Sequence, residues 1–251
     1  MKENILGYQV DALSVDACVD QVFASLGPEQ GKGWLACLNP HSYAVALEDA
    51  FFAQALKSAD WLVPDGVGVV YASRMLGGDV RARVTGSDVF QGVHARMNTR
   101  NAMSVFFLGA SDDTLAEICS RMAQDFPNIR VAGTYSPPFK PVYSDTELNE
   151  MVHAINQAAP DVLWVGMTAP KQEKWIFDNL PRLDVKFAGA IGAVFDFYVG
   201  KVKRSHPVFQ RLGLEWLPRL VQQPGRLWKR MFVSAPLFVW HVIKQAVRQR
   251  A

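Results

Sequence analysis

The feature that most constrains the fold is an alternation of short apolar runs with longer segments of helical spacing. The runs MSVFFLGA (103–110) and DVLWVGM (161–167) are continuous apolar strands, and each leads into a helix-like segment. Continuous apolar strands that alternate with helices are typical of a parallel sheet covered by helices on both faces. The sequence therefore predicts an α/β fold with a mostly parallel sheet.

The same pattern extends over most of the chain. Ser87 and Ser111 are expected to be N-caps of two of the helices, and Pro170 to open a third. The spacing predicts strands at 33–40, 61–64, 103–110, 128–135, 161–167 and 185–192, and helices at 41–60, 66–76, 86–97, 111–126, 144–159 and 170–180.

Residues that directly follow the strands are the first candidates for function. In parallel α/β sheets, ligands bind at the carboxyl ends of the strands. The residues at those positions are Asn39, Asp65, Gly109, Gly166 and the glycine-containing stretch 189–192.

Asp65 is the most unusual of these residues. In ADWLVPDGVGVVYASRMLGG (59–78), the carboxylate stands between Pro64 and Gly66, where a strand meets a helix. An aspartate at such a junction often caps the helix. Alternatively, a partly buried carboxylate at the ligand edge serves as a general base, and Gly66 lets a substrate approach the backbone closely. The stretch alone leaves both interpretations open.

Glycine-rich turns elsewhere give weaker signals. DGVGVV lacks the third glycine of a dinucleotide fingerprint, because Tyr71 stands in its place, so a nicotinamide site is not expected. FFLGASDDT (106–114) runs from a strand through Gly109 into a capped helix, which suits either an anion site or a tight turn. Asp112 and Asp113 suit the first turn of that helix. No metal ion and no cofactor are predicted.

Composition favours a protein of a reducing compartment. The three cysteines, Cys18, Cys37 and Cys119, are scattered and show no metal-ligand or disulfide spacing. The first residues show no signal-peptide core, and no apolar stretch reaches the roughly 18 residues that span a bilayer. We therefore expect a cytoplasmic protein.

The charge is divided unequally along the chain. Residues 201–251 hold eleven of the 26 basic residues and one of the 24 acidic residues, so the tail is strongly positive and residues 1–200 are negative. We predict a domain boundary near residue 200, with a core at 1–200 and a basic, aromatic appendage at 201–251, which prolines divide into short pieces.

Three partners suit this appendage. It could lie on an anionic membrane, bind RNA, or pack on the core as ordinary terminal helices. Its tryptophans and the apolar run MFVSAPLFVWHVI favour the membrane surface over nucleic acid.

Taken in order, the motifs LNP, ADWLVPDGVGVVYASRMLGG, RVTGSD, FLGA, PKQEKWI, GAVFDFYVGKVKRSH, GLEWLPRL and RLWKR resemble the WecG/TagA/CpsF family of bacterial glycosyltransferases. The resemblance covers about residues 33–231. It implies a Rossmann-like core and a C-terminal helical appendage. It also implies an inverting, metal-independent transfer of a sugar from a UDP-sugar to an undecaprenyl-diphosphate-linked saccharide, in the synthesis of surface polysaccharides such as teichoic acid, capsule or exopolysaccharide.

The resemblance also suggests roles for single residues. Asp65 matches the family's general base on the acceptor hydroxyl, and Asn39 matches a pocket residue. Cys37 stands where many relatives have threonine, so a hydroxyl contact is missing at that position. Arg83 and Gln172 match further pocket positions, and the resemblance suggests that Asp196 reads the uracil or the ribose.

The leaving diphosphate carries concentrated negative charge, and without a metal a cationic group must stabilise it. Arg219, Arg226 and Arg230 are the expected suppliers, because guanidinium groups bind phosphate oxygens in pairs.

The sequence thus predicts a glycosyltransferase that is peripheral on the inner face of the cell membrane and does not bind nucleic acid. Self-association of the core is a further expectation from the resemblance. The alternative is a UDP-binding scaffold or regulator of a polysaccharide assembly complex that has the same pocket and no turnover.

Overall fold

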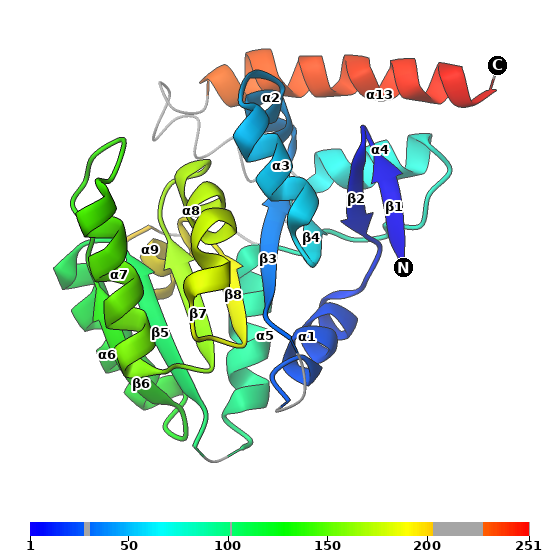
Figure 1. Ribbon diagram of the computed structural model, residues 1–251. Helices are drawn as coiled ribbons and strands as arrows, with labels where there is room; N and C mark the ends of the chain where they lie inside the picture. The colour runs from blue at the N-terminus through cyan, green and yellow to red at the C-terminus, as the bar shows by residue number, and fades with distance from the viewer. Residues whose placement is uncertain (28–30, 101, 203–227, 251) are drawn as a thin grey trace.

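A parallel sheet with helices on both faces forms the centre of the molecule (Figure 1). The computed structural model describes residues 1–27, 31–100, 102–202 and 228–250. Within these residues, six strands pair in the order β4-β3-β8-β7-β5-β6, and every pairing is parallel. The predicted α/β fold class is confirmed.

The strands of this sheet are β3 (Gly33–Leu38), β4 (Trp61–Pro64), β5 (Ser104–Gly109), β6 (Arg130–Tyr135), β7 (Val162–Gly166) and β8 (Phe187–Ala190). The helices around it are α1 (Val15–Ala24), α2 (Pro40–Glu48), α3 (Ala50–Ser58), α4 (Val67–Met75), α5 (Gly86–Met97), α6 (Asp112–Asp125), α7 (Asp145–Ala158), α8 (Lys171–Asn179) and α9 (Val194–Tyr198). A 3₁₀ turn, η1 (Leu180–Arg182), follows α8.

Each face of the sheet has its own hydrophobic core. Alternate residues of β7 point to opposite faces, as the pleat of a strand requires. Leu163 and Val165 join the cluster under α2, α3, α7 and α8, while Val162 and Trp164 join the cluster under α1, α5, α6 and α9. Because both faces are covered, the inner strands are almost entirely apolar, which produced the continuous runs in the sequence, whereas the edge strand β6 is partly exposed.

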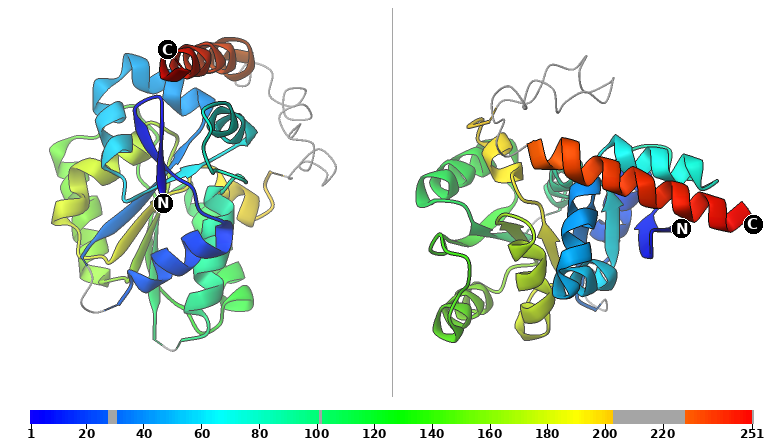
Figure 2. Two further views of the ribbon diagram at one scale, coloured as in Figure 1. Left: turned by 90° about the vertical axis from the view of Figure 1, so that its right-hand side faces the viewer. Right: turned by 90° about the horizontal axis from the view of Figure 1, so that it is seen from above.

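Two terminal elements lie beside this core. An antiparallel hairpin, β1 (Lys2–Ile5) and β2 (Tyr8–Asp11), precedes α1 and was not predicted from the sequence. At the other end, a π-helical turn η2 (Arg230–Ser234) leads into α13 (Ala235–Arg250). Helix α13 crosses the carboxyl edge of the sheet and packs on α2 and α4 (Figures 1 and 2).

The inner face of α13 is part of the core. Phe238 and Val242 are each 1% exposed and belong to the same cluster as Tyr43 of α2. The predicted boundary near residue 200 falls just after α9, and residues 203–227, which begin the predicted appendage, lie outside the described residues.

Three local predictions are wrong. The helix expected at 41–60 is divided at Asp49, which ends α2 and caps α3 by accepting a hydrogen bond from the Phe52 N–H. Thr85, not Ser87, caps α5, because Asp88 completes a capping box with it. Pro236, one of the prolines expected to divide the appendage, does not interrupt its last helix, since it is the second residue of α13.

Candidate active site

The side chains of Asn39 and Asp65 meet where β3 and β4 end. The Asn39 amide Nδ2 lies 3.4 Å from Asp65 Oδ2, and the Asp65 N–H donates to the Leu38 carbonyl at 2.8 Å. Asn39 is also the N-cap of α2, because its Oδ1 accepts from the N–H groups of His41 and Ser42. The cap thereby fixes the amide with its NH₂ group toward Asp65.

The capping interpretation of Asp65 does not hold. Gly66 occupies the N-cap position of α4, and its φ of +98° is a conformation that glycine adopts without strain. Asp65 therefore precedes the helix, half-buried at the carboxyl edge of the sheet.

Arg83 is brought beside the same strand end by the segment that leads into α5. The Val84 N–H donates to the Pro64 carbonyl at 3.0 Å, so Arg83 lies next to the Pro64–Asp65 step. Its side chain is half-buried. Arg83 and Asp65 thus belong to the same end of the edge.

A second part of the edge lies between β5 and β7. The chain leaves β5 through α6 toward β6 and leaves β7 through α8 in the opposite direction toward β8, which makes this the topological switch point where such sheets bind ligands. Gly109 and Gly166 are paired in register here. A Cβ on Gly109 would stand 2.8 Å from the Gly166 carbonyl oxygen, so side chains are excluded from this position.

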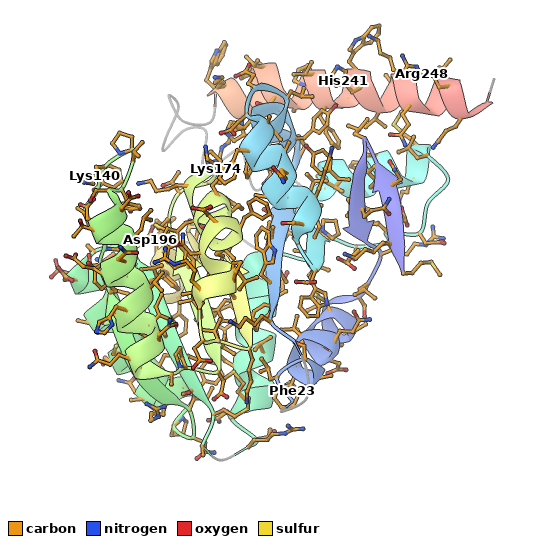
Figure 3. The ribbon with its side chains drawn as sticks, viewed as in Figure 1. Phe23, Lys140, Lys174, Asp196, His241 and Arg248 are labelled. Carbon is orange, nitrogen blue, oxygen red and sulfur yellow. The ribbon has the colours of Figure 1, made fainter. Side chains whose placement is uncertain are left out.

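Helix α9 borders the switch point. The Phe195 ring covers Gly166, and a Cβ on Gly166 would lie 2.2 Å from that ring. Asp196, the next residue, lies half-buried on α9 (Figure 3). The Ser111 cap that was predicted for α6 is confirmed, so a helix N-terminus also faces this region.

Gln172 is not a simple ligand contact. Its side chain is 4% exposed, its Oε1 accepts from the Gly192 N–H at 2.9 Å, and its Nε2 donates to Glu173 Oε1 at 2.9 Å. It thus joins the start of α8 to the turn after β8, between the two parts of the edge.

Glu173 was missed in the sequence. It is 3% exposed, and burial raises the pKa of its carboxyl group to about 7. The signal that could have found it is its spacing, since Glu173 lies three residues before the buried Ile176 and therefore on the same face of α8.

Cys37 lies close enough to Asp65 and Glu173 to sense both charges. Burial raises the pKa of its thiol well above the usual range, and the two carboxylates raise it further. The thiol therefore stays neutral, and it stands where a hydroxyl was expected from the resemblance.

The C-terminal segment contacts the same region through α2. His41 Nδ1 lies 3.0 Å from the Ser234 hydroxyl, and the Tyr43 hydroxyl lies 2.5 Å from His241 Nδ1 (Figure 3 labels His241). Arg230, at the start of η2, is half-buried near the beginning of α2. Arg219 and Arg226, predicted to act with it, lie outside the described residues.

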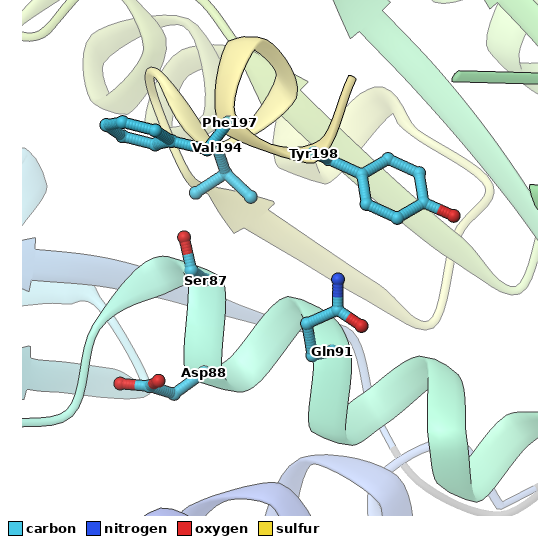
Figure 4. Close-up of a pocket in the computed structure, with 6 residues that line it drawn as sticks. All are labelled: Ser87, Asp88, Gln91, Val194, Phe197 and Tyr198. Atoms are coloured by element: carbon cyan, nitrogen blue, oxygen red, sulfur yellow. The ribbon is translucent and has the colours of Figure 1, made fainter. Parts of the chain in front are cut away.

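A separate small pocket lies between α5 and α9 (Figure 4). Its volume of about 170 Å³ is below that of sites for molecules the size of a nucleotide sugar. It is lined by Ser87, Asp88, Gln91, Val194, Phe197 and Tyr198, none of which is a predicted site residue.

Neither a metal cluster nor a membrane span is found in the part of the chain that the structure describes. No three His, Cys, Asp or Glu side chains there are grouped to hold a metal ion. No described helix is both long and apolar enough to cross a bilayer.

Taken together, the candidate site is the carboxyl edge of a doubly covered parallel sheet. It has a carboxylate and an arginine at one end and a glycine-lined switch point at the other. Such an edge is typical of enzymes that act on nucleotide-linked substrates. The chain belongs to the WecG/TagA/CpsF family of glycosyl transferases, whose family model matches residues 3–251. The resemblance inferred from the motifs is thereby confirmed.

Three similar curated relatives share the name N-acetylglucosaminyldiphosphoundecaprenol N-acetyl-beta-D-mannosaminyltransferase. The chain is 33% identical to that protein of Bacillus spizizenii W23 over 220 residues, which covers 86% of this chain and 81% of the relative. It is 31% identical to that of Bacillus subtilis 168, covering 84% and 79%. It is 26% identical to that of Staphylococcus aureus MW2, covering 97% and 92%.

Proposed function

We propose that this protein transfers a sugar from a UDP-sugar to a saccharide linked to a polyprenyl diphosphate, with inversion at the anomeric carbon and without a metal ion. The relatives' name supports the acceptor class, and it makes an N-acetylhexosamine, N-acetylmannosamine first, the leading donor sugar. The observation that supports the catalytic role of Asp65 is its position at the edge of the sheet beside the Asn39 amide.

Asp65 is assigned as the general base. Its carboxylate removes the proton of the acceptor hydroxyl, and the oxygen attacks the anomeric carbon of the donor. The bond from that carbon to the UDP oxygen breaks, and its electron pair leaves with UDP. A single displacement of this kind inverts the anomeric centre. The Asn39 amide keeps the carboxylate oriented during the attack.

The donor is assigned to the edge between Asp65 and the switch point. Strands β4 and β5 are separated by β3, β8 and β7, which corresponds to about 19 Å across the edge. An extended nucleotide sugar can lie along this edge. Its nucleoside is then near Gly109, Gly166 and Asp196, and its sugar is near Asp65.

Arginines are assigned to the leaving diphosphate. Arg83 already lies at the Asp65 end of the edge. Arg230 is assigned to the same end, because η2, to which it belongs, contacts α2. Arg219 and Arg226 complete the set in this proposal. Cationic side chains aimed at developing charge are a major source of transition-state stabilisation.

The outer face of α13 is assigned to an anionic membrane surface. The segment 228–250 contains no acidic residue, and Lys244 and Arg248 lie beside its exposed apolar side chains. Those exposed side chains are Trp228, Phe232, Val233, Val239, Trp240, Ile243 and Val247. Aromatic and basic residues combined in this way suit the interface of a bilayer, where the polyprenyl acceptor resides.

The test is a measurement of UDP release from a panel of UDP-sugars, with and without a polyprenyl-diphosphate-linked N-acetylglucosamine in detergent. The proposal expects release from one donor that depends on the acceptor, persists in EDTA, and is lost in Asp65→Asn while UDP still binds. UDP binding without release on any acceptor would instead favour the non-catalytic scaffold.

A further inference from the structure

Glu173 is a buried carboxylic acid that the proposed chemistry does not use. We propose that Glu173 is a positioning residue for the donor: through Gln172 it holds the turn at Gly192, and with it helix α9, against the switch point of the sheet. This inference rests on the proposed UDP-sugar donor and adds a residue to its binding site.

The connection consists of two hydrogen bonds in series. Glu173 Oε1 accepts from Gln172 Nε2 at 2.9 Å, and Gln172 Oε1 accepts from the Gly192 N–H at 2.9 Å. Both side chains are at least 96% buried. Because the carboxyl oxygen accepts on one side and the backbone N–H donates on the other, only one orientation of the Gln172 amide satisfies both. Without Glu173, the Gly192 N–H is the one bond of this pair that still holds the amide in this orientation.

The Gly192 turn determines where α9 begins. Gly192 has a φ of +57°, and Val194, two residues later, is the first residue of α9. Phe195 fits against Gly166 so closely that a Cβ on that glycine would lie 2.2 Å from the ring. A displacement of the turn therefore moves Phe195 and Asp196 relative to Gly166, which is where the nucleoside is assigned.

The choice of a carboxylic acid here is not explained by packing. Glu173 Oε2 is buried and has no hydrogen-bond partner within the described ranges. An unpaired buried carboxyl oxygen is unfavourable, and an apolar side chain of the same size would avoid it. Among the described residues, the hydrogen bond from Gln172 is the side-chain contact that this polar group makes.

Three variants separate this role from simple destabilisation. Glu173→Met fills a similar volume and removes the acceptor, whereas Glu173→Gln keeps an oxygen that can accept from Gln172. Lys174→Met is the matched control on the same helix, because it breaks the Lys174–Asp49 ion pair and leaves the Gln172 bridge intact.

The first readout is UDP affinity by calorimetry, together with donor KM and kcat. We expect Glu173→Met to weaken UDP binding and raise donor KM between about tenfold and a hundredfold, with kcat at saturating donor changed little. Glu173→Gln and Lys174→Met should bind UDP like the wild type. Wild-type UDP affinity in Glu173→Met, or equal impairment in Glu173→Gln, would overturn the inference.

The second readout does not need the donor. Hydrogen exchange of the Gly192 amide should be faster in Glu173→Met than in the wild type and unchanged in Lys174→Met, and equal rates in all three would overturn the positioning role. If wild-type protein does not bind UDP, the proposed donor fails and the assignment to donor binding fails with it. If the wild type binds UDP and Glu173→Met does so equally well, only the inference fails.

Discussion

The Asn39 amide lies 3.4 Å from the Asp65 carboxylate, although the two residues belong to different strand ends and are 26 positions apart. The amide is fixed because the other half of the same side chain caps α2. One asparagine thus ties the start of a helix to the orientation of the candidate base. Substitutions can therefore separate the role of Asn39 as a helix cap from its role as a hydrogen-bond donor to Asp65.

Asp65→Asn should lower the transfer rate by about 10²- to 10⁴-fold, since a general base contributes that much. The expected stability change is small, because Gly66 and not Asp65 occupies the N-cap of α4. Initial rates and UDP affinity measured on the same preparation check this. Asp79→Asn, an exposed carboxylate at the surface, is the control. Full activity of Asp65→Asn would remove the assignment of the base.

Asn39→Ser should separate the two roles of the asparagine. Serine is also a good N-cap, so the free energy of unfolding should change by less than about 0.5 kcal/mol. The hydrogen bond to Asp65 is lost, and the rate should fall about tenfold, which corresponds to roughly 1.4 kcal/mol. Urea unfolding and initial rates provide the two measurements. An unchanged rate would show that Asp65 does not depend on this amide.

The two faces of α13 should respond oppositely to substitution. Phe238→Ala, on the buried face, should destabilise the protein by about 3 to 5 kcal/mol. Trp240→Glu and Val247→Glu, on the exposed face, should leave stability nearly unchanged and weaken binding to vesicles that contain anionic lipid. Thermal unfolding and vesicle co-sedimentation distinguish these outcomes. Vesicle binding that survives both glutamate substitutions would contradict the membrane assignment.

Glu173 should make stability fall as the pH rises. Its pKa is raised to about 7 in the folded protein from an ordinary value of 4.5, so the folded state holds the proton more tightly. That contribution is fully present below pH 4.5 and is lost as the pH rises through about 7. Cys37 is the neighbouring titratable group whose pKa the Glu173 charge raises, and its thiol stays neutral over this range.

The wild type should therefore lose about 2 to 3 kcal/mol of unfolding free energy from pH 5 to pH 8 through this group. Glu173→Gln lacks the titrating group, so its unfolding free energy should rise by that amount relative to the wild type over the same range. Urea titrations at the two pH values measure the difference. A difference that does not change with pH would mean that Glu173 is already ionised at pH 5 in the folded protein.

His94 should make the protein sensitive to acid. It is fully buried, burial lowers its pKa to about 3 from 6.5, and its Nε2 accepts from the Trp164 indole at 3.0 Å. The unfolded chain binds the proton first, so stability is lost as the pH falls below about 6.5.

This loss should amount to about 3 kcal/mol between pH 7 and pH 4. His94→Gln, which can still accept from Trp164, is the comparison that removes the titrating group. NMR of the imidazole provides a direct check, because its resonances should not titrate between pH 5 and pH 8. A His94 that titrates near pH 6.5 would contradict the assignment.

The alternation of apolar runs and helices sufficed to predict the sheet, because both faces are covered and the inner strands are therefore apolar. The Ser111 cap was predicted correctly for a different reason, since capping depends on neighbours within one turn. The predictions of a Ser87 cap and of one helix at 41–60 were wrong because two local signals competed at each place. Thr85 has the better-placed partner in Asp88, and Asp49 can end one helix while it begins the next.

The chain order alone placed Asp65, Asn39, Gly109 and Gly166 after strands, and parallel pairing then requires them to share one edge. What only the tertiary structure decided is which of these residues meet. The register of β3 against β4 brings Asn39 to Asp65, and the position of β8 beside β7 brings Gly192 to Gln172. The burial of Glu173 and the docking of α13 were likewise decided there, because desolvation and packing depend on neighbours that are distant in sequence.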